Sequence, residues 1–189
     1  LIEKMRSDKS LRELLQMVAL MPMAIPGIVL GLAYIFFFNA KGNPLNFFYA
    51  TMAILVVNTI VHFYTVSHLS AITAIKKLDD EFESVSLSLK IPTYKMFFRV
   101  TLPVCLPTVF DIFIYLFCNA MTTVSGVIFL YTYDTTLASV SAIHLDEQGD
   151  VAGAAAMAML IVYISFVVRG LHTLISTLLL KRTQAWRNI

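Results

Sequence analysis

The sequence predicts an all-helical protein that crosses a membrane several times. Of its 189 residues, 58% are hydrophobic and only 14% are charged, whereas a typical soluble domain carries about 25% charged residues. Four long segments contain only Asp111 and Arg169 as charged residues. Each segment is longer than the ~20 apolar residues that a membrane-spanning helix needs. We therefore expect a single transmembrane domain over residues 1–189 with spans at about 16–38, 47–69, 102–131 and 151–180.

Two prolines and two glycines mark the first predicted span. Pro22 and Pro26 each remove a backbone donor, so this span should be bent or unwound near one end. Such a bend either lines a pore or is purely structural. Gly27 and Gly31 form a G-x-x-x-G spacing, which lets a second helix approach closely. We expect these two glycines to serve helix packing.

Polar side chains share one face in each of the next two predicted spans. In the second span Asn58 and His62 are four positions apart, and in the third Asn119, Thr122 and Thr123 fall within about one turn. These side chains either line a path for a hydrophilic solute or make hydrogen bonds between helices. They are the candidate path residues.

One carboxylate lies inside the third predicted span. Asp111 follows Pro107 by four positions. Because proline favours the first positions of a helix, we expect Asp111 in the first turn, where the helix dipole stabilises a negative charge.

The basic residues predict how the chain lies across the membrane. Twelve of the 14 lysines and arginines fall within residues 1–15, 70–101 and 181–189. Positive residues in short loops favour the cytoplasmic side. Both chain ends and the 70–101 loop are therefore predicted to be cytoplasmic, and the other two connections to lie on the opposite side.

The 70–101 loop predicts a helix, a break and a second helix. Apolar residues recur at helical spacing from Leu78 to Leu89. Pro92 disfavours helical geometry in the residue before it and ends this helix. A second apolar face follows between Tyr94 and Phe98. Such an element either docks into a groove on a cytoplasmic partner or rests on lipid.

The run ESVSLSLKIPTYKMFFRVTLP, residues 83–103, resembles the EAA loop of permease subunits in bacterial ABC importers. The final Leu-Pro and the aromatic and basic residues before it fit the family pattern. Two positions depart from it, because the glutamate position falls on Ser84 and the glycine position on Lys90. PMAIPGIVLGLAYI, residues 22–35, is similar to the early core span of permeases for iron(III), thiamine and phosphonates. ESVSLSLKIP, residues 83–92, together with the tail LLKRTQAWR, residues 179–187, most resembles 2-aminoethylphosphonate permeases.

The resemblance implies a type I ABC importer permease in the bacterial inner membrane, of which this chain would be a fragment lacking one or two N-terminal spans. It implies several partners: a separate ATP-binding-cassette ATPase, a periplasmic or lipid-anchored substrate-binding protein, a second permease subunit or second half of a fused permease, and the lipid bilayer. The loop would couple to the ATPase. The coupling residues on this basis are Phe82, Glu83, Ser84, Val85, Leu89, Lys90, Pro92, Leu102 and Pro103.

The implied function is the passage of a small polar solute. 2-Aminoethylphosphonate is the first expectation, with iron(III), thiamine and polyamine as alternatives. An ion-coupled secondary carrier is the alternative from another class, although only Asp111 and His62 would serve it.

Several other classes of function are not expected. No G-x-x-x-x-G-K-[ST] motif occurs, so the chain is not expected to be an enzyme, and ATP hydrolysis should reside on another chain. The four histidines lack metal-ligand spacing, so we expect no metal, cofactor or catalytic residue. A net charge of +2 gives no reason to expect nucleic acid.

Overall fold

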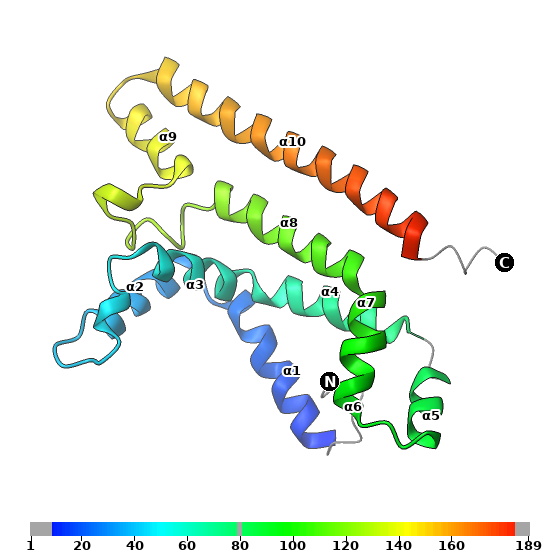
Figure 1. The fold of residues 1–189 in the computed structure, drawn as a ribbon. Coiled ribbons are helices and arrows are strands. Elements are labelled where there is room, and N and C mark those ends of the chain that lie inside the picture. Colours follow the sequence, from blue (N-terminus) through cyan, green and yellow to red (C-terminus); the bar gives the residue numbers. More distant parts are fainter. Residues whose placement is uncertain (1–8, 79–80, 184–189) are drawn as a thin grey trace.

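The computed structural model describes residues 9–78 and 81–183, and all regular structure in these ranges is helical (Figure 1). The all-helical prediction is thereby confirmed. The longer helices are α1 (Lys9–Ala24), α2 (Gly27–Phe38), α3 (Met52–His62), α4 (Tyr64–Lys76), α5 (Glu81–Ser88), α8 (Leu106–Thr122), α9 (Ala138–Glu147) and α10 (Val151–Thr183). The shorter elements are the 3₁₀ turns η1 (Asn46–Phe48) and η3 (Tyr133–Thr135), α6 (Thr93–Met96), the π-helical η2 (Phe97–Thr101) and α7 (Leu102–Val104).

Three of the four predicted spans are bent pairs of helices. Among the described residues only α10, over Val151–Thr177, is by itself long and apolar enough to cross a membrane. The pair α1–α2 is bent by 103°, α3–α4 by 57°, and the helices on either side of Cys105 by 69°. Counting each bent pair as one span gives up to four spans in this part of the chain. Their placement across a bilayer stays a prediction.

The first two breaks have different local causes. Pro26, at φ −58° and ψ 138°, is the N-cap of α2, and a proline pushes the residue before it out of helical geometry. Pro22, in contrast, lies inside α1 without ending it. Phe63, at φ −97° and ψ 11°, separates α3 from α4 with neither glycine nor proline beside it. The first break follows from the sequence, and the second does not.

The third predicted span, 102–131, is helical only to Thr122. Thr123 is extended, with φ −72° and ψ 138°, and a series of turns follows before η3. These turns bury Val127 and Leu130 against Ile54 and Leu55 of α3. The helix therefore stops early because the segment after it enters the small core. The predicted 132–150 connection also contains helix α9, which the sequence analysis did not expect.

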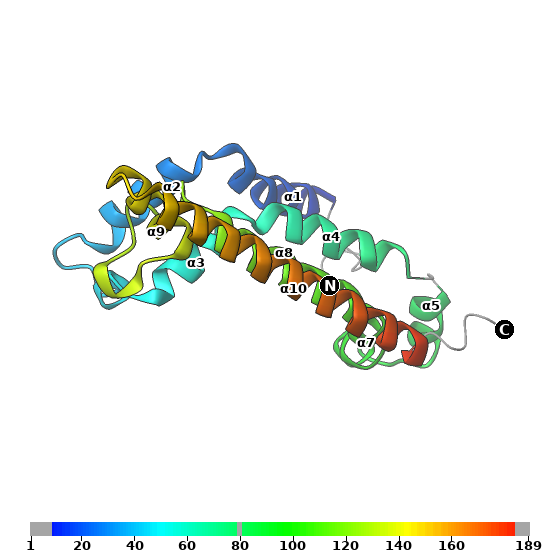
Figure 2. The same cartoon turned by 90° about the horizontal axis from the view of Figure 1, so that it is seen from above.

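The helices form an open layer with the loop segment at one end. Helix α10 packs along α8 and α9, and α4 packs between α1 and α8. In both views the start of α1, the α5–α7 segment and the last turns of α10 lie toward the same end (Figures 1 and 2). The 39–51 connection and α9 lie toward the opposite end. Within residues 9–78 and 81–183, the parts of the three basic regions thus lie toward one end of the molecule.

Candidate functional site

Helix α5 ends in a capping motif centred on Lys90. The Lys90 N–H donates to the Leu87 carbonyl at 3.0 Å, and the Ile91 N–H donates to the Ser86 carbonyl at 2.9 Å. Lys90 itself has φ 52°, in the left-handed region. This is the Schellman arrangement, in which that position is usually glycine. The glycine position of the EAA pattern is therefore occupied by a lysine that adopts the backbone conformation glycine favours.

Replacing Lys90 by glycine should stabilise the end of α5 by about 1 kcal/mol, because a side chain in the left-handed region costs roughly that amount. The measurement is amide hydrogen exchange at Ile91, whose protection should rise. Ser88→Gly is the matched control, since a glycine inside a helix costs about 0.5–1 kcal/mol. Equal loss of protection in both variants would contradict this account of Lys90.

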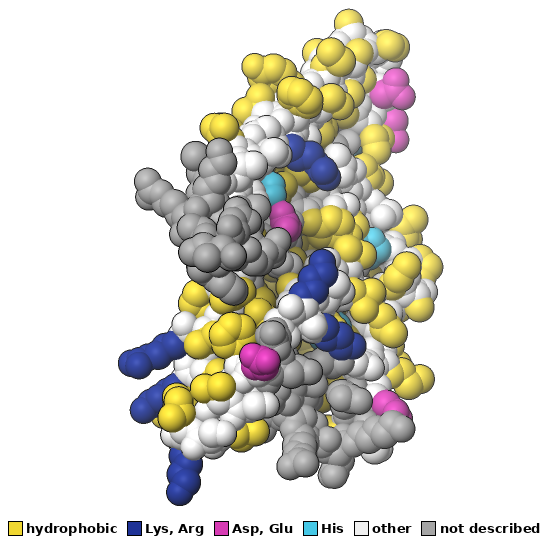
Figure 3. Space-filling view, turned by 90° about the vertical axis from the view of Figure 1, so that its right-hand side faces the viewer, with side chains coloured by type: hydrophobic (Ala, Val, Ile, Leu, Met, Phe, Trp, Pro, Cys, Tyr) yellow, Lys and Arg dark blue, Asp and Glu magenta, His cyan; other side chains and the backbone are white. Residues whose placement is uncertain are grey.

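A cavity of about 510 Å³ lies between α5 and the α6–η2 segment. Its wall is apolar at Phe82, Val85 and Met96, and cationic at Lys95 and Arg99. The full lining is Phe82, Val85, Ser86, Lys90, Ile91, Pro92, Lys95, Met96, Arg99 and Val100. Figure 3, seen from this side, shows Lys and Arg side chains standing among hydrophobic ones. A pocket lined by both apolar and basic side chains fits an apolar, acidic surface on a partner.

The predicted coupling residues occupy different places in this segment. Phe82, Val85, Lys90 and Pro92 line the cavity, whereas Ser84 and Leu89 are exposed on α5 and just after it. The Glu83 side chain lies outside the described side chains. Helix, break and helix are present as predicted, with Pro92 as the N-cap of α6.

The Leu102–Pro103 pair forms the short helix α7, directly before the 69° bend. Cys105, at φ −85° and ψ 0°, occupies the bend itself. Pro107 lies in the first turn of α8, where the absence of a backbone N–H is tolerated. The α5–α7 segment is therefore joined to α8 through the 69° bend at Cys105.

A second candidate site forms where α2, α3 and the turn after α8 meet. Asn58 is fully buried, and its Nδ2 donates to the Gly126 carbonyl at 2.8 Å, across 68 positions of sequence. A Cβ on Gly27 would lie 2.6 Å from Ser125 Oγ and 3.2 Å from His62 Cε1. We call Gly27, Gly31, Asn58, His62, Ser125 and Gly126 the Gly126 cluster. Its residues come from three separate segments of the chain, and its polar side chains from α3 and the turn after α8.

The two glycines of the G-x-x-x-G spacing are both buried against this turn. A Cβ on Gly31 would lie 2.8 Å from the Gly126 carbonyl oxygen. Real Cβ atoms do not approach backbone oxygen so closely, so the contact requires glycine. The glycines thus face an irregular turn and not the regular helix that the spacing suggests.

The other predicted path residues, Asn119, Thr122 and Thr123, make hydrogen bonds outside the Gly126 cluster in the described part of the chain. Asn119 Nδ2 donates to the Tyr115 carbonyl at 2.7 Å, and Thr122 Oγ1 to the Cys118 carbonyl at 3.1 Å. Thr123 lies beyond the helix, and its carbonyl accepts a bond from Ser139 Oγ at 2.7 Å. Asn119 and Thr122 lie three positions apart on α8 and Thr123 is its C-cap, so their part in a path stays a prediction. Ser125, which the sequence analysis missed, belongs to the Gly126 cluster.

A contact between a histidine and a carboxylate links α8 to α10. His172 Nε2 lies 3.1 Å from Asp111 Oδ1, with the His172 side chain 16% and the Asp111 side chain 60% exposed. The atoms are not aligned as a hydrogen bond, so the contact is electrostatic and needs a protonated His172. Since α8 begins at Leu106, Asp111 lies in its second turn. The first-turn prediction is wrong, and the carboxylate has a partner on another helix.

A double-mutant cycle of Asp111→Leu and His172→Leu should show a coupling energy of about 0.6 kcal/mol, the average for polar contacts between membrane helices. The measurement is unfolding in detergent. Asp111→Leu combined with His144→Leu is the control, because His144 contacts Tyr131 at 2.9 Å and lies outside this pair. Equal coupling in the two cycles would argue against the ion pair.

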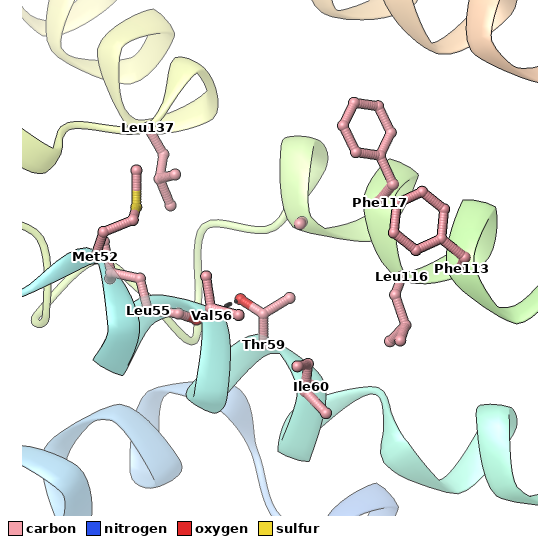
Figure 4. A pocket seen from close by; sticks show the side chains of 10 residues that line it. Met52, Leu55, Val56, Thr59, Ile60, Phe113, Leu116, Phe117 and Leu137 are labelled. Carbon is pink, nitrogen blue, oxygen red and sulfur yellow. Dashed lines mark hydrogen bonds between the residues drawn. The ribbon is translucent and has the colours of Figure 1, made fainter.

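An apolar cavity of about 380 Å³ separates α3 from α8 (Figure 4). Leu55, Val56 and Ile60 face Phe113 and Phe117 across it. The hydroxyl of its single lining threonine is already bonded to a backbone carbonyl of α3. This lining suits hydrocarbon and offers little to a polar solute. In the described ranges no three His, Cys, Asp or Glu side chains are grouped to hold a metal ion.

The chain resembles known transport proteins in sequence. FbpB of Actinobacillus pleuropneumoniae, named as a ferric transport system permease protein, is 27% identical over 163 residues, 86% of this chain and 23% of that protein. FbpB 1 of Haemophilus influenzae, also named for ferric transport, is 32% identical over 130 residues, 69% of this chain and 20% of that protein. The chain thus spans about a quarter or less of the length of these relatives. They give no support to the 2-aminoethylphosphonate resemblance.

The fold resembles that of a solved importer. The crystal structure of a bacterial ABC transporter involved in the import of the acidic polysaccharide alginate matches with a TM-score of 0.73 and 16% identity. The match covers 93% of this chain and 69% of that chain. In addition, residues 1–181 match the family model described as the inner membrane component of binding-protein-dependent transport systems. The chain therefore belongs to this family of ABC importer permeases, which are membrane components and not enzymes.

Proposed function

We propose that the protein forms part of the permease of an ABC importer that carries ferric iron inward across the bacterial inner membrane. The observation that carries this proposal is the family match over residues 1–181. The α5–α7 segment supports it, because it gives the chain a surface suited to a partner at one end. Two relatives named for ferric transport support the choice of cargo.

The proposed partners follow from the division of labour in an importer. A separate ATPase would bind the α5–α7 segment, with Phe82 and Met96 giving apolar contact and Lys95 and Arg99 giving charge contacts. A substrate-binding protein would deliver cargo at the opposite end, and a second permease half would complete the pathway. On this proposal both chain ends and the α5–α7 segment are cytoplasmic, as the positive charges predict.

Ferric iron ranks before the other cargo candidates. The permeases similar in sequence are named for ferric transport. Thiamine and polyamine have no such support, nor does 2-aminoethylphosphonate. An ion-coupled carrier would need titratable groups along the path, and Asp111 is engaged with His172 at the α8–α10 contact.

For the path itself, Asn58 and His62 are the residues we retain. Asn58 is fully buried where separate segments meet, and His62 lies beside it on α3. Asn119 and Thr122 bond to the backbone of their own helix. We therefore propose that the path passes the Gly126 cluster.

The experiment is uptake by the full-length permease, reconstituted in vesicles with its ATPase and binding protein. We expect radiolabelled ferric iron to enter only with ATP, and 2-aminoethylphosphonate, thiamine and polyamines not to compete. An ATPase variant lacking the lysine of its phosphate-binding loop is the control and should stop uptake. Uptake that follows an ion gradient without ATP would overturn the proposal in favour of a secondary carrier.

A further inference from the structure

A cavity of about 400 Å³ lies between α4 and the first turn of α8. Its lining is Val66, Leu69, Ser70, Thr73, Ala74 and Lys77 from α4 and its C-cap, and Thr108 from α8. It shares no residue with the cavity at α5 or with the Gly126 cluster. A space of this size is typical of sites for small molecules. Neither the proposed ATPase contact nor the proposed path accounts for it.

The lining changes from apolar to charged along α4. Val66 and Leu69 lie near the break at Phe63, whereas Lys77 is the C-cap at the other end of the helix. The eleven positions from Val66 to Lys77 correspond to about 16 Å at ~1.5 Å per residue. That is roughly half of a ~30 Å hydrocarbon core. With α3 and α4 counted as one span, the cavity therefore runs from near the middle of the span to one end.

The charge in the lining selects the sign of the ligand. Among the described residues that line the cavity, only Lys77 carries a charge. Its ammonium group has donors and no acceptor, so it attracts an anion. Within residues 9–78 and 81–183 it makes no ion pair. The Ser70 and Thr73 hydroxyls each donate to a backbone carbonyl of their own helix at 2.8 Å, so neither competes with Lys77 in setting that sign.

The two ends of the cavity together favour a ligand with a charged head and an apolar tail. A small soluble anion would leave the apolar end unfilled, and an uncharged lipid would leave Lys77 without a counter-charge. Val66 and Leu69 are both exposed, so a chain from the bilayer can reach them. Lysine side chains near a membrane surface attract anionic lipids. These conditions are met by a phospholipid with a net negative headgroup.

We propose that this cavity binds an anionic phospholipid, with the phosphate at the Lys77 end and an acyl chain along Val66 and Leu69. The inference goes beyond the proposed function, because it depends on the chain being a membrane component and not on the cargo or the ATPase contact. Thr108 lies three positions after Cys105, where the chain bends by 69°. A bound lipid would therefore touch both α4 and α8 beside this bend and hold the two helices together.

The test uses the full-length permease complex, purified in detergent, with phosphatidylglycerol as the probe. The lipid that remains bound is measured by mass spectrometry. Lys77→Gln should retain about fivefold less phosphatidylglycerol, since it removes one attractive charge at the headgroup. Its retention of phosphatidylcholine should not change. Lys76→Gln is the matched control, because it removes the same charge from the neighbouring position, which does not line the cavity. It should retain phosphatidylglycerol as the wild type does.

A second variant tests the apolar end. Ala74→Phe leaves Lys77 in place and fills the cavity, so it should also retain less phosphatidylglycerol. Added phosphatidylglycerol should raise the unfolding temperature of the wild type and of neither Lys77→Gln nor Ala74→Phe, because a ligand stabilises only the state that binds it. Soluble glycerol 3-phosphate should not displace the lipid, because it has no acyl chain to fill the apolar end.

Three results would overturn the lipid site. Equal loss of phosphatidylglycerol in Lys77→Gln and Lys76→Gln would indicate general attraction to a basic surface. Wild-type retention by Lys77→Gln or Ala74→Phe would show that the cavity does not hold the lipid. Displacement by glycerol 3-phosphate would indicate a site for a free phosphate. The importer proposal is tested separately by iron uptake, so each of these results leaves it intact.

Discussion

Replacing Gly31 by leucine is expected to prevent stable folding of the permease. A Cβ at this position would lie 2.8 Å from the Gly126 carbonyl oxygen and 3.6 Å from its carbon, and both are backbone atoms that cannot rotate away. Overpacking a well-filled contact costs about 1–3 kcal/mol, and a leucine against backbone should exceed that range. Asn58 would also lose its bond to Gly126 if the turn moved. The measurement is thermal unfolding in detergent.

Gly170→Leu is the control for this prediction. Gly170 also lies in a helix, α10, but a Cβ there would have no neighbour within 4 Å. The control should therefore unfold at the wild-type temperature. If both leucine variants unfold alike, the α2–Gly126 contact is not the reason for glycine at position 31.

A double substitution in the α5–α7 segment, Phe82→Ala with Arg99→Glu, is expected to stop transport while ATP hydrolysis continues. Phe82 contributes an apolar surface and Arg99 contributes a positive charge to the lining of the same cavity. Loss of an aromatic anchor costs an interface about 2 kcal/mol or more, and a reversed charge adds repulsion against an acidic partner. The measurement is iron taken up per ATP hydrolysed in reconstituted vesicles.

The matched control is Phe36→Ala with Lys41→Glu, which removes an aromatic ring and reverses a positive charge at the opposite end of the molecule. Phe36 is 76% exposed on α2, and Lys41 lies in the connection that follows. This variant should keep the wild-type ratio of uptake to hydrolysis. A loss of coupling in the control, or none in the test variant, would remove the α5–α7 segment from the proposed ATPase contact.

The fold class could be predicted from the sequence because apolar length and charge clustering are local properties. Four segments nearly free of charge required helices, and Pro92 and Pro26 marked where two helices stop. The break at Phe63 had no such mark, since neither proline nor glycine is beside it. The end of α8 at Thr122 depends on the burial of Val127 in the core, which no local pattern reports.

The candidate sites were predictable only in part, because a hydrogen bond or ion pair between distant positions leaves no trace in one sequence. Asn58 was a candidate from its spacing, but its partner Gly126 lies 68 positions away. His172 likewise gave no sign of pairing with Asp111. Lys90 shows the opposite case. Its departure from the family pattern was visible, and the backbone conformation explains why that position matters.

Because the chain bends at Cys105, a small rotation of α8 about this point would move its far end by several ångströms. This helix has 17 residues, a length of about 25 Å at ~1.5 Å per residue. A swing of about 10° at the bend, similar in size to known allosteric rotations, displaces the far tip by roughly 4 Å. That displacement exceeds the 2.8 Å between a Cβ placed on Gly31 and the Gly126 carbonyl oxygen. On the proposed coupling, a small rotation of α6–α7 would therefore be enough to separate the turn from α2.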